Sequence, residues 1–174
     1  MPKINPFDKK LRVDPESHRR IKDLPKVEAV KKIEALVERY ESIKSSGKIK
    51  KYTEEETKKD FILPLFAALG WDVFNKDEVS AEEKISAGRV DYGFYLDDRP
   101  RFYLETKALR EDLEREEFAN QAVQYSWNKD VSWAVLTDFE GLKLFNAQDI
   151  DAKLWSKLFK DIPYTKYIER FDEL

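Results

Sequence analysis

The chain has 174 residues, no cysteine, a single histidine (His18) and a formal net charge of −3, which suits one domain with a sizeable core. The absence of cysteine excludes disulfides, thiolate metal sites and a cysteine nucleophile, and a lone histidine argues against histidine-based triads and zinc sites. Carboxylates and carbonyls would have to hold any metal, which suits Mg²⁺ or Mn²⁺. Without a membrane-length apolar run or the apolar stretch of a signal peptide, we expect a soluble, cytoplasmic protein.

The N-terminal part of the chain is basic and the rest is acidic. Residues 1–51 hold 15 Lys and Arg against 8 Asp and Glu, a net charge of +7, whereas residues 52–174 carry −10. A basic segment could follow a nucleic-acid backbone while the acidic body supplies metal-binding carboxylates. The alternative is a helix whose basic side chains are simply solvated, which charge runs usually are.

Apolar spacing predicts a mixed α/β domain. The expected elements, in chain order, are a helix over 25–46, a helix over 53–69, a strand entry at 71–75, an edge strand over 78–85, strands over 88–96 and 101–109, a helix over roughly 112–128, strands over 132–137 and 141–145, and a helical segment over 152–174.

The second helix carries clear start and stop signals. Thr53 followed three residues later by Glu56 forms a capping box, and Gly70 is a fitting stop. Pro64 lies inside this helix and should kink or loosen it, because proline cannot donate the backbone hydrogen bond that an α-helix needs there.

The two central strands predict a specific register. Their even-numbered residues are apolar on both strands, so even positions must pair with even positions. A pairing sum of 196 sets Asp91 opposite Glu105, with Lys107 on the same face. An ordinary two-residue hairpin would give an odd sum, so we expect an odd-length loop or a bulge near residues 97–100.

Two carboxylates placed opposite each other repel unless a cation lies between them. A metal ion would satisfy Asp91 and Glu105 together. The other interpretation is that Lys107 neutralises both acids on an exposed sheet face. The residues by themselves leave both interpretations open.

The strand pair also resembles a known family. "VDYGF" followed by "FYLETKAL" is similar to the Asp…Glu-x-Lys signature of the PD-(D/E)xK nuclease superfamily. The position before Asp91 is Val90 instead of the family's proline, whose side chain is not a ligand.

Three flanking blocks extend the resemblance over residues 53–147. They are similar to the N-terminal endonuclease domain of type I restriction motor subunits and of fused type IIG restriction–modification enzymes. In chain order the blocks read "EEETKKDFILPLFAALGWDVFNKDEVSAEEKI", "QAVQYSWNK" and "WAVLTDFEGLKLFNA".

This resemblance implies a restriction-endonuclease-like α/β core made of a helix, a three-stranded antiparallel meander, a helix and two further strands. The expected parts are a basic arm and helix packed on the core (1–52), the nuclease core (53–150) and a C-terminal helical segment (151–174). "YIERFDEL" resembles the stretch where fused enzymes continue toward a methyltransferase region. No methyltransferase motif occurs in these residues, so an excised or free-standing nuclease domain is expected.

The resemblance further implies Mg²⁺-dependent hydrolysis of DNA phosphodiester bonds, with Mn²⁺ able to substitute. Asp91, Glu105 and the backbone carbonyl of Thr106 would hold the metal. Lys107 would orient or deprotonate the attacking water and stabilise charge on the phosphate.

A glutamate from the opening helix is expected to assist the metal site. Glu55 is favoured, Glu54 follows, and Glu56 is assigned to the capping box. Glu82 is a weaker candidate. The alternative is that these acids are solvated and favoured by the helix dipole.

The helix after the Glu-x-Lys strand supplies Gln121 and Tyr125, four residues apart on one face. Gln121 is expected to act in or brace the catalytic site, and Tyr125 to contact DNA. The alternative is a surface glutamine and a half-buried aromatic. Lys58 and Arg89 are further candidates for phosphate contacts.

The expected partners are double-stranded DNA and a fused or separate methyltransferase or specificity region. A transient dimer is also expected, because double-strand cleavage needs two nicks. Two other functions remain open from the sequence. One is a catalytically silent DNA-binding or assembly module with the same fold, and the other is a repair or RNA nuclease using the same metal chemistry.

Overall fold

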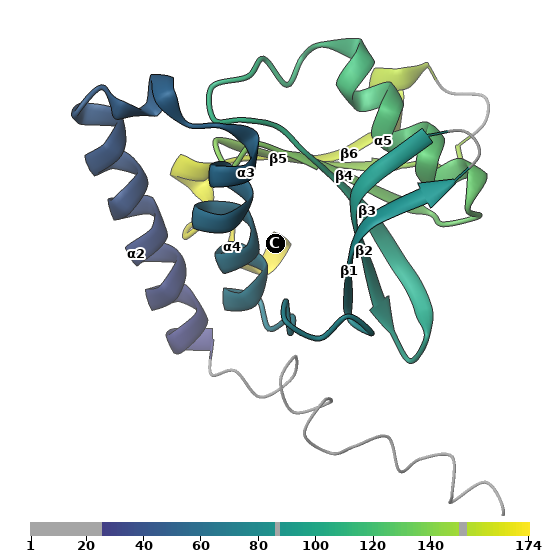
Figure 1. Ribbon diagram of the computed structural model, residues 1–174, viewed down its shortest axis with the longest axis horizontal. Coiled ribbons are helices and arrows are strands. Elements are labelled where there is room, and N and C mark those ends of the chain that lie inside the picture. Colours follow the sequence, from purple (N-terminus) through teal and green to yellow (C-terminus); the bar gives the residue numbers. More distant parts are fainter. Residues whose placement is uncertain (1–25, 86–87, 150–152) are drawn as a thin grey trace, which may run out of the picture.

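The computed structural model describes residues 26–85, 88–149 and 153–174 (Figure 1). Its elements are, in chain order, α2 (Lys26–Ser45), η1 (Lys48–Lys51), α3 (Glu54–Thr57), η2 (Lys58–Ile62), α4 (Leu63–Ala68), β1 (Val79–Ile85), β2 (Gly88–Leu96), β3 (Arg99–Thr106), α5 (Glu116–Asn128), β4 (Trp133–Thr137), β5 (Gly141–Asn146), η3 (Leu154–Lys157), β6 (Leu158–Pro163), η4 (Tyr164–Lys166) and η5 (Phe171–Glu173). No helix in these ranges is both long and apolar enough to cross a membrane.

A six-stranded sheet in the order β1-β2-β3-β4-β5-β6 forms the centre of the domain. Neighbouring strands are antiparallel except β3 and β4, which are parallel and are connected through α5. The predicted three-stranded antiparallel meander is therefore present as β1, β2 and β3. The predicted mixed α/β class is confirmed.

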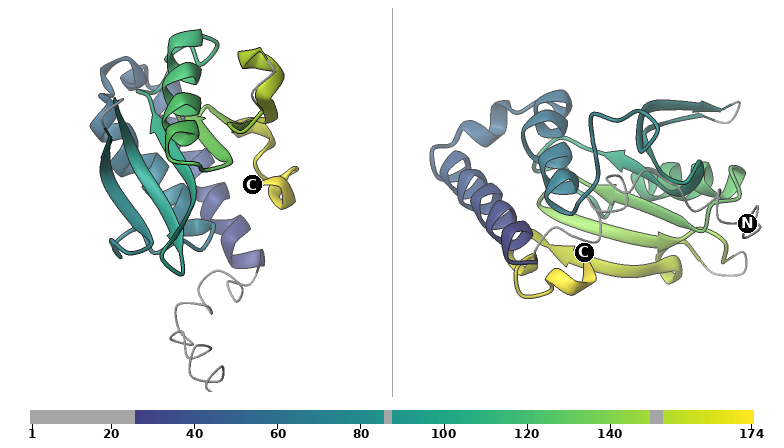
Figure 2. Two further views of the ribbon diagram at one scale, coloured as in Figure 1. Left: turned by 90° about the vertical axis from the view of Figure 1, so that its right-hand side faces the viewer. Right: turned by 90° about the horizontal axis from the view of Figure 1, so that it is seen from below.

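Helices cover both faces of the sheet (Figures 1 and 2). Along β4, Val135 joins the cluster that contains α2 and α4 residues, whereas Ala134 and Leu136 join the cluster that contains α5 residues. Because successive side chains of a strand point to opposite faces, α5 lies across the sheet from α2 and α4.

The core between α4, α2 and the sheet is aromatic. Phe94 of β2 stacks on Phe102 of β3 with ring centroids 4.4 Å apart, and Phe66 of α4 packs against Phe94 at 4.7 Å. Tyr40 brings α2 into the same cluster by an edge contact with Phe61. The basic N-terminal helix is thus packed on the sheet domain through its apolar side.

The capping box at the start of α3 is confirmed. The Thr53 hydroxyl accepts from the backbone N–H of Glu56, and the Glu56 carboxylate accepts from the backbone N–H of Thr53. The stop at Gly70 is confirmed too, because Gly70 has a φ of 105° and the N–H of Trp71 returns to the carbonyl of Phe66.

Pro64 loosens the helix as predicted, and it does so by changing the hydrogen-bond period. The segment η2 before it is π-helical. In an α-helix the carbonyl of Asp60 would accept from residue 64, which has no N–H. The guanidinium of Arg39 lies 3.4 Å from this carbonyl and supplies a replacement donor.

The predicted pairing sum of β2 and β3 is confirmed for residues 92–94 with 102–104, and the pairing of Asp91 with Glu105 stays a prediction. Tyr92 pairs with Leu104 and Phe94 pairs with Phe102, which is the pairing sum of 196. The four residues of these two pairs therefore lie together in the cluster that contains α4, whereas Val90 joins Tyr103 and Tyr125 in the cluster that contains α5.

The predicted irregularity near the hairpin is present as well. After Phe94 the register shifts, and Tyr95 pairs with Pro100. The turn itself consists of Asp97 and Asp98, both with positive φ (52° and 59°), the conformation of a two-residue hairpin turn that follows strand twist. The bulge lets a two-residue turn coexist with an even pairing sum.

The predicted helical character of residues 152–174 is wrong. Strand β6 occupies the middle of this segment and pairs antiparallel with β5, flanked only by short 3₁₀ turns. The otherwise unpaired edge of β5 offers hydrogen bonds to β6, and Pro163 disfavours a continuous helix. The predicted strand entry at 71–75 is also wrong: these residues are irregular with a turn at 73–74, and β1 begins at Val79.

Two phenylalanines give a matched test of the core. We expect Phe94→Ala to lower the free energy of unfolding by about 3–5 kcal/mol, because the Phe94 ring is fully buried and its removal leaves a cavity. Phe74→Ala should change it by less than about 0.5 kcal/mol, since Phe74 is 95% exposed. Urea denaturation measures both, and equal effects would contradict this packing.

Candidate active site

The candidate site lies where α3 and η2 meet the ends of β2 and β3. The backbone N–H of Leu109, just after β3, donates to the Thr57 hydroxyl at 3.1 Å. A second tie joins the same loop to η1, because the Arg110 guanidinium donates to the carbonyl of Lys50 at 2.8 Å. Arg110 has a φ of 66°, and this contact helps to hold it there. The helical segment and the strand exit are thus fastened together.

Asp91 has donors on both of its carboxylate oxygens. Oδ2 accepts from the backbone N–H and from the hydroxyl of Thr106, each at 2.7 Å. Oδ1 pairs with Nζ of Lys58 at 2.7 Å. The first two bonds cross from β2 to the end of β3, so Asp91 is oriented by the strand pair itself.

Lys58 is the centre of an acidic cluster. Besides Asp91, its Nζ lies 2.9 Å from Oε1 of Glu54 and 3.0 Å from Oε1 of Glu55, and its side chain is only 10% exposed. Burial would lower the pKa of Lys58, but its hydrogen bonds to these three carboxylates raise it overall above its ordinary value. The ammonium is therefore charged and neutralises acids from two elements.

The sequence predicts phosphate contacts for Lys58 and not this central role. A signal was nevertheless present. Glu54 and Glu55 precede Lys58 by four and three residues, the spacings at which helical side chains meet. The contact with Asp91 could not be read from spacing, because it depends on how η2 packs against β2.

Glu105 is buried and only half satisfied. The residue is 3% exposed; Oε1 pairs with Nζ of Lys107 at 2.6 Å, whereas Oε2 is buried with no hydrogen-bond partner. Burial and then the negative charge of Asp91 raise its pKa to about 7, although Lys107 acts in the opposite direction. A buried carboxylate oxygen that accepts no hydrogen bond is available to coordinate a cation.

Lys107 is held from two sides. Its Nζ pairs with Glu105 and lies 4.6 Å from the centroid of the Phe118 ring, which also carries the Arg115 guanidinium carbon at 4.5 Å. The lysine is 12% exposed in its side chain, so its ammonium is largely shielded from water. This position favours interaction with a developing negative charge.

The donors here are oxygens, which suit a hard divalent ion such as Mg²⁺. Within residues 26–85, 88–149 and 153–174, no three acidic or histidine side chains already converge as a metal-binding group. Asp91 and Glu105 are instead each paired with a lysine. The unpartnered Oε2 of Glu105 is the feature of this arrangement that fits a metal.

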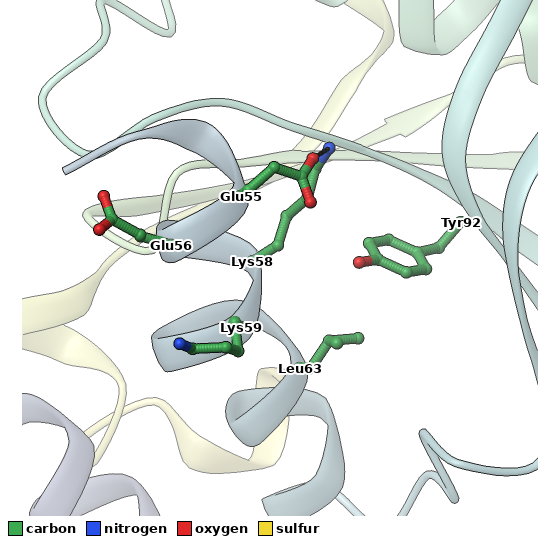
Figure 3. Close-up of a pocket in the computed structure, with 6 residues that line it drawn as sticks. All are labelled: Glu55, Glu56, Lys58, Lys59, Leu63 and Tyr92. Atoms are coloured by element: carbon green, nitrogen blue, oxygen red, sulfur yellow. Dashed lines mark hydrogen bonds and ion pairs between the residues drawn. The ribbon is translucent and has the colours of Figure 1, made fainter.

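A pocket of about 360 Å³ opens beside the acidic cluster, between the α3–α4 segment and β2. Figure 3 shows Glu55 and Lys58 meeting at its upper edge, Tyr92 facing them from β2, and Glu56 and Lys59 pointing away. The cluster is therefore reachable from solvent through this opening.

The structure distinguishes the opening-helix glutamates. Glu56 is the capping-box residue, as predicted. Glu54 and Glu55 both contact Lys58, but the negative charge of Glu54 also raises the pKa of Glu105, whereas Glu55 is 83% exposed. The side chain of Glu82 lies outside the described residues.

The predicted residues of α5 contact the start of β2 and the middle of β3. Gln121 is exposed and its Nε2 donates to the carbonyl of Arg89 at 3.2 Å, which braces the start of β2. Tyr125 is 3% exposed and packs edge-on against Tyr103 at 4.8 Å. This burial favours the alternative of a packed helix aromatic, and the DNA contact of Tyr125 stays a prediction. Arg89 is exposed.

A second buried acid lies in the turn between β4 and β5. Asp138 is 1% exposed, and its Oδ1 accepts from the backbone N–H of Gly141 at 3.0 Å. Burial raises its pKa to about 7 against the effect of that hydrogen bond. Asp138 stabilises a turn in which Phe139 adopts a φ of 76°, so its role is structural.

The chain is similar to the type II restriction enzyme and methyltransferase RM.Eco57I of Escherichia coli. The two are 28% identical over 160 residues, a match that covers 82% of this chain and 16% of that protein. The chain thus spans about a sixth of the length of this curated relative. No family model and no solved structure gives a significant match.

The raised pKa of Glu105 predicts a pH-dependent stability in metal-free protein. Unfolded Glu105 releases its proton near pH 4.5, whereas the folded residue keeps it up to about pH 7. The stabilisation from the bound proton is complete below pH 4.5 and is lost as pH rises to 7, with a slope of at most about 1.4 kcal/mol per pH unit. We expect Glu105→Gln to remove this part of the pH dependence, measured by urea denaturation from pH 4.5 to 8.

Asp138→Asn is the matched control for this measurement, because Asp138 titrates in the same range but lies in a different part of the fold. Each single variant should flatten the profile partly and the double variant further. A Glu105→Gln profile that parallels that of the unaltered protein would contradict the assignment.

Proposed function

We propose that this chain is a metal-dependent endonuclease domain of a restriction–modification system, which hydrolyses DNA phosphodiester bonds. The observation that carries the proposal is Glu105, a buried acid with one oxygen paired to Lys107 and the other without a partner, close enough to Asp91 to feel its charge. A buried acid of this kind is costly for stability and is typical of a functional site. The similarity to a restriction enzyme and methyltransferase supports the same conclusion.

In this proposal Asp91, Glu105 and the carbonyl of Thr106 hold Mg²⁺, and Mn²⁺ substitutes for it. The bound ion supplies positive charge for the scissile phosphate and acidifies water. The N–H and hydroxyl of Thr106 keep the Asp91 carboxylate oriented. Glu54 is the auxiliary acid whose charge raises the pKa of Glu105, and Glu55 lies at the edge of the pocket.

Lys107 acts on the reacting groups in this proposal. Glu105 and the Phe118 ring fix the ammonium, so that it can donate to the attacking water or to a phosphate oxygen as negative charge develops. The Phe118 ring, in cation–π contact with the ammonium, limits water around it and strengthens that interaction.

The proposed substrate is double-stranded DNA. Exposed cations lie along the edge of the site: Lys48, Lys50 and Lys51 on η1, and Arg110 bonded to the carbonyl of Lys50. Such side chains bind phosphates without reading sequence. We further propose that sequence recognition and methyl transfer belong to a fused or separate region, since the relative whose name includes both activities is about five times as long as this chain. Two copies would act transiently for double-strand cleavage.

One observation favours a catalytically silent DNA-binding or assembly module instead. Both oxygens of Asp91 already have donors within the chain, so the acidic cluster is stable without a metal. Metal binding separates the two functions, because a silent module needs no divalent ion.

The catalytic role of Lys107 can be tested with plasmid DNA. We expect Glu105→Ala and Lys107→Ala to lower Mg²⁺-dependent nicking of supercoiled plasmid by at least about 100-fold, because each removes a group that acts on the phosphate or its metal. Lys129→Ala is the control, since Lys129 is an exposed lysine at the far end of α5. Absence of Mn²⁺ binding to the unaltered protein at millimolar concentration would refute the proposed chemistry.

The basic edge predicts a salt-dependent affinity for duplex DNA. We expect the triple variant Lys48→Ala, Lys50→Ala, Lys51→Ala to weaken binding and to reduce the slope of log affinity against log salt by up to about 3, one for each lost phosphate contact. Fluorescence anisotropy in Ca²⁺ measures this without cleavage. An unchanged slope would show that these three lysines make no contact with DNA phosphates.

A further inference from the structure

The present donors of Asp91 oppose the binding of a metal ion beside it. Oδ2 is occupied twice by Thr106, and Oδ1 is occupied by Lys58 at 2.7 Å. The lone pair that remains, on Oδ1, lies beside the Lys58 ammonium, whose positive charge repels a divalent ion that approaches it.

The three donors differ in how easily they can leave. The N–H of Thr106 belongs to the backbone of β3, and the Thr106 hydroxyl is fully buried beside it. The ammonium of Lys58 is at the end of a flexible four-carbon side chain that comes from a different element. Lys58 is thus the donor that can move without disturbing the sheet.

We propose that Lys58 is an internal counter-ion that a divalent metal displaces from Asp91, and that the displaced ammonium then pairs with a phosphate of the bound DNA. This inference rests on the proposed nuclease function and adds a positioning residue to it. The lysine keeps the acidic cluster neutral before the metal arrives, and its displacement couples metal binding to substrate binding.

A pocket beside Lys58 offers space for its displaced side chain. It lines the 360 Å³ pocket together with Glu55, whose carboxylate is at the rim (Figure 3). A dication on Asp91 repels the ammonium toward this opening. Glu54 and Glu55 hold it by ion pairs from its own helical segment, so it remains at the mouth of the site.

A reciprocal dependence follows from the competition. Without DNA, the metal must break a largely buried ion pair, which weakens its binding. With DNA, a phosphate oxygen offers Lys58 a new anion, so DNA strengthens metal binding and the metal strengthens DNA binding by the same factor. The chain would then assemble its metal site chiefly when substrate is present.

Mn²⁺ titration calorimetry of the full chain tests the displacement step. We expect Lys58→Met to bind Mn²⁺ at least about tenfold more tightly than the unaltered protein, because the competing charge is gone. Lys59→Met is the matched control: Lys59 is adjacent, its side chain is 78% exposed and its Nζ pairs with Asp60, so Mn²⁺ affinity should not change. Asp91→Asn identifies the binding that depends on this site.

Ca²⁺ titrations with and without duplex DNA test the coupling. We expect DNA to tighten Ca²⁺ binding by about tenfold in the unaltered protein and by less than about twofold in Lys58→Met. Equal tightening in the two proteins would overturn the role of the displaced ammonium.

If Lys58→Met does not fold, as judged by thermal melting, NMR of the unaltered protein with ¹³C-labelled lysines replaces it. We expect Mg²⁺ to shift the Lys58 side-chain signal and to leave that of Lys59 in place, and saturation by Mg²⁺ without a Lys58 shift overturns the inference. Asp91-dependent Mn²⁺ binding that is equal in Lys58→Met and Lys59→Met overturns it too, while the proposed function stands. No Asp91-dependent binding in any variant overturns both.

Discussion

The even-with-even pairing of β2 and β3 is the constraint on which the site depends. Because Tyr92 pairs with Leu104, the next residues, Asp91 and Glu105, come to the same end of the strand pair, and the charge of Asp91 raises the pKa of Glu105. The contacts of Thr106 with Asp91 then follow from the same register, because they cross between the ends of the two strands. A slip of one residue would move the apolar set away from α4 and separate the two acids.

This register forces buried acids into one place, and the chain offsets their repulsion with lysines. Lys58 serves Asp91 and Lys107 serves Glu105. The compensation is incomplete at Glu105, where a free oxygen and a pKa raised to about 7 remain. Core packing on both faces of the sheet, including the stacked Phe94 and Phe102, has to supply the stability that this arrangement costs.

Local signals made much of this arrangement predictable from the sequence. Alternation gave the pairing sum, Thr53 with Glu56 gave the helix start, and Pro64 gave the loosened turn, because each depends on neighbours in the chain or on one strand pair. Strand β6 was missed because its apolar residues suit either a helix or a strand until the free edge of β5 is known. The burial of Tyr125 likewise depends on how α5 packs against β3, which spacing along α5 does not specify.

The origin of each lysine decides what it can do. Lys107 is two residues from Glu105 on the same chain segment. Its position beside that acid therefore does not depend on how a helix packs against the strand. Lys58 reaches Asp91 across an interface, from the π-helical segment that Pro64 creates, and it shares its ammonium with Glu54 and Glu55. A fixed cation suits a role in chemistry, where geometry must be constant. A shared cation from another element suits exchange, because its other partners retain it when one contact is lost.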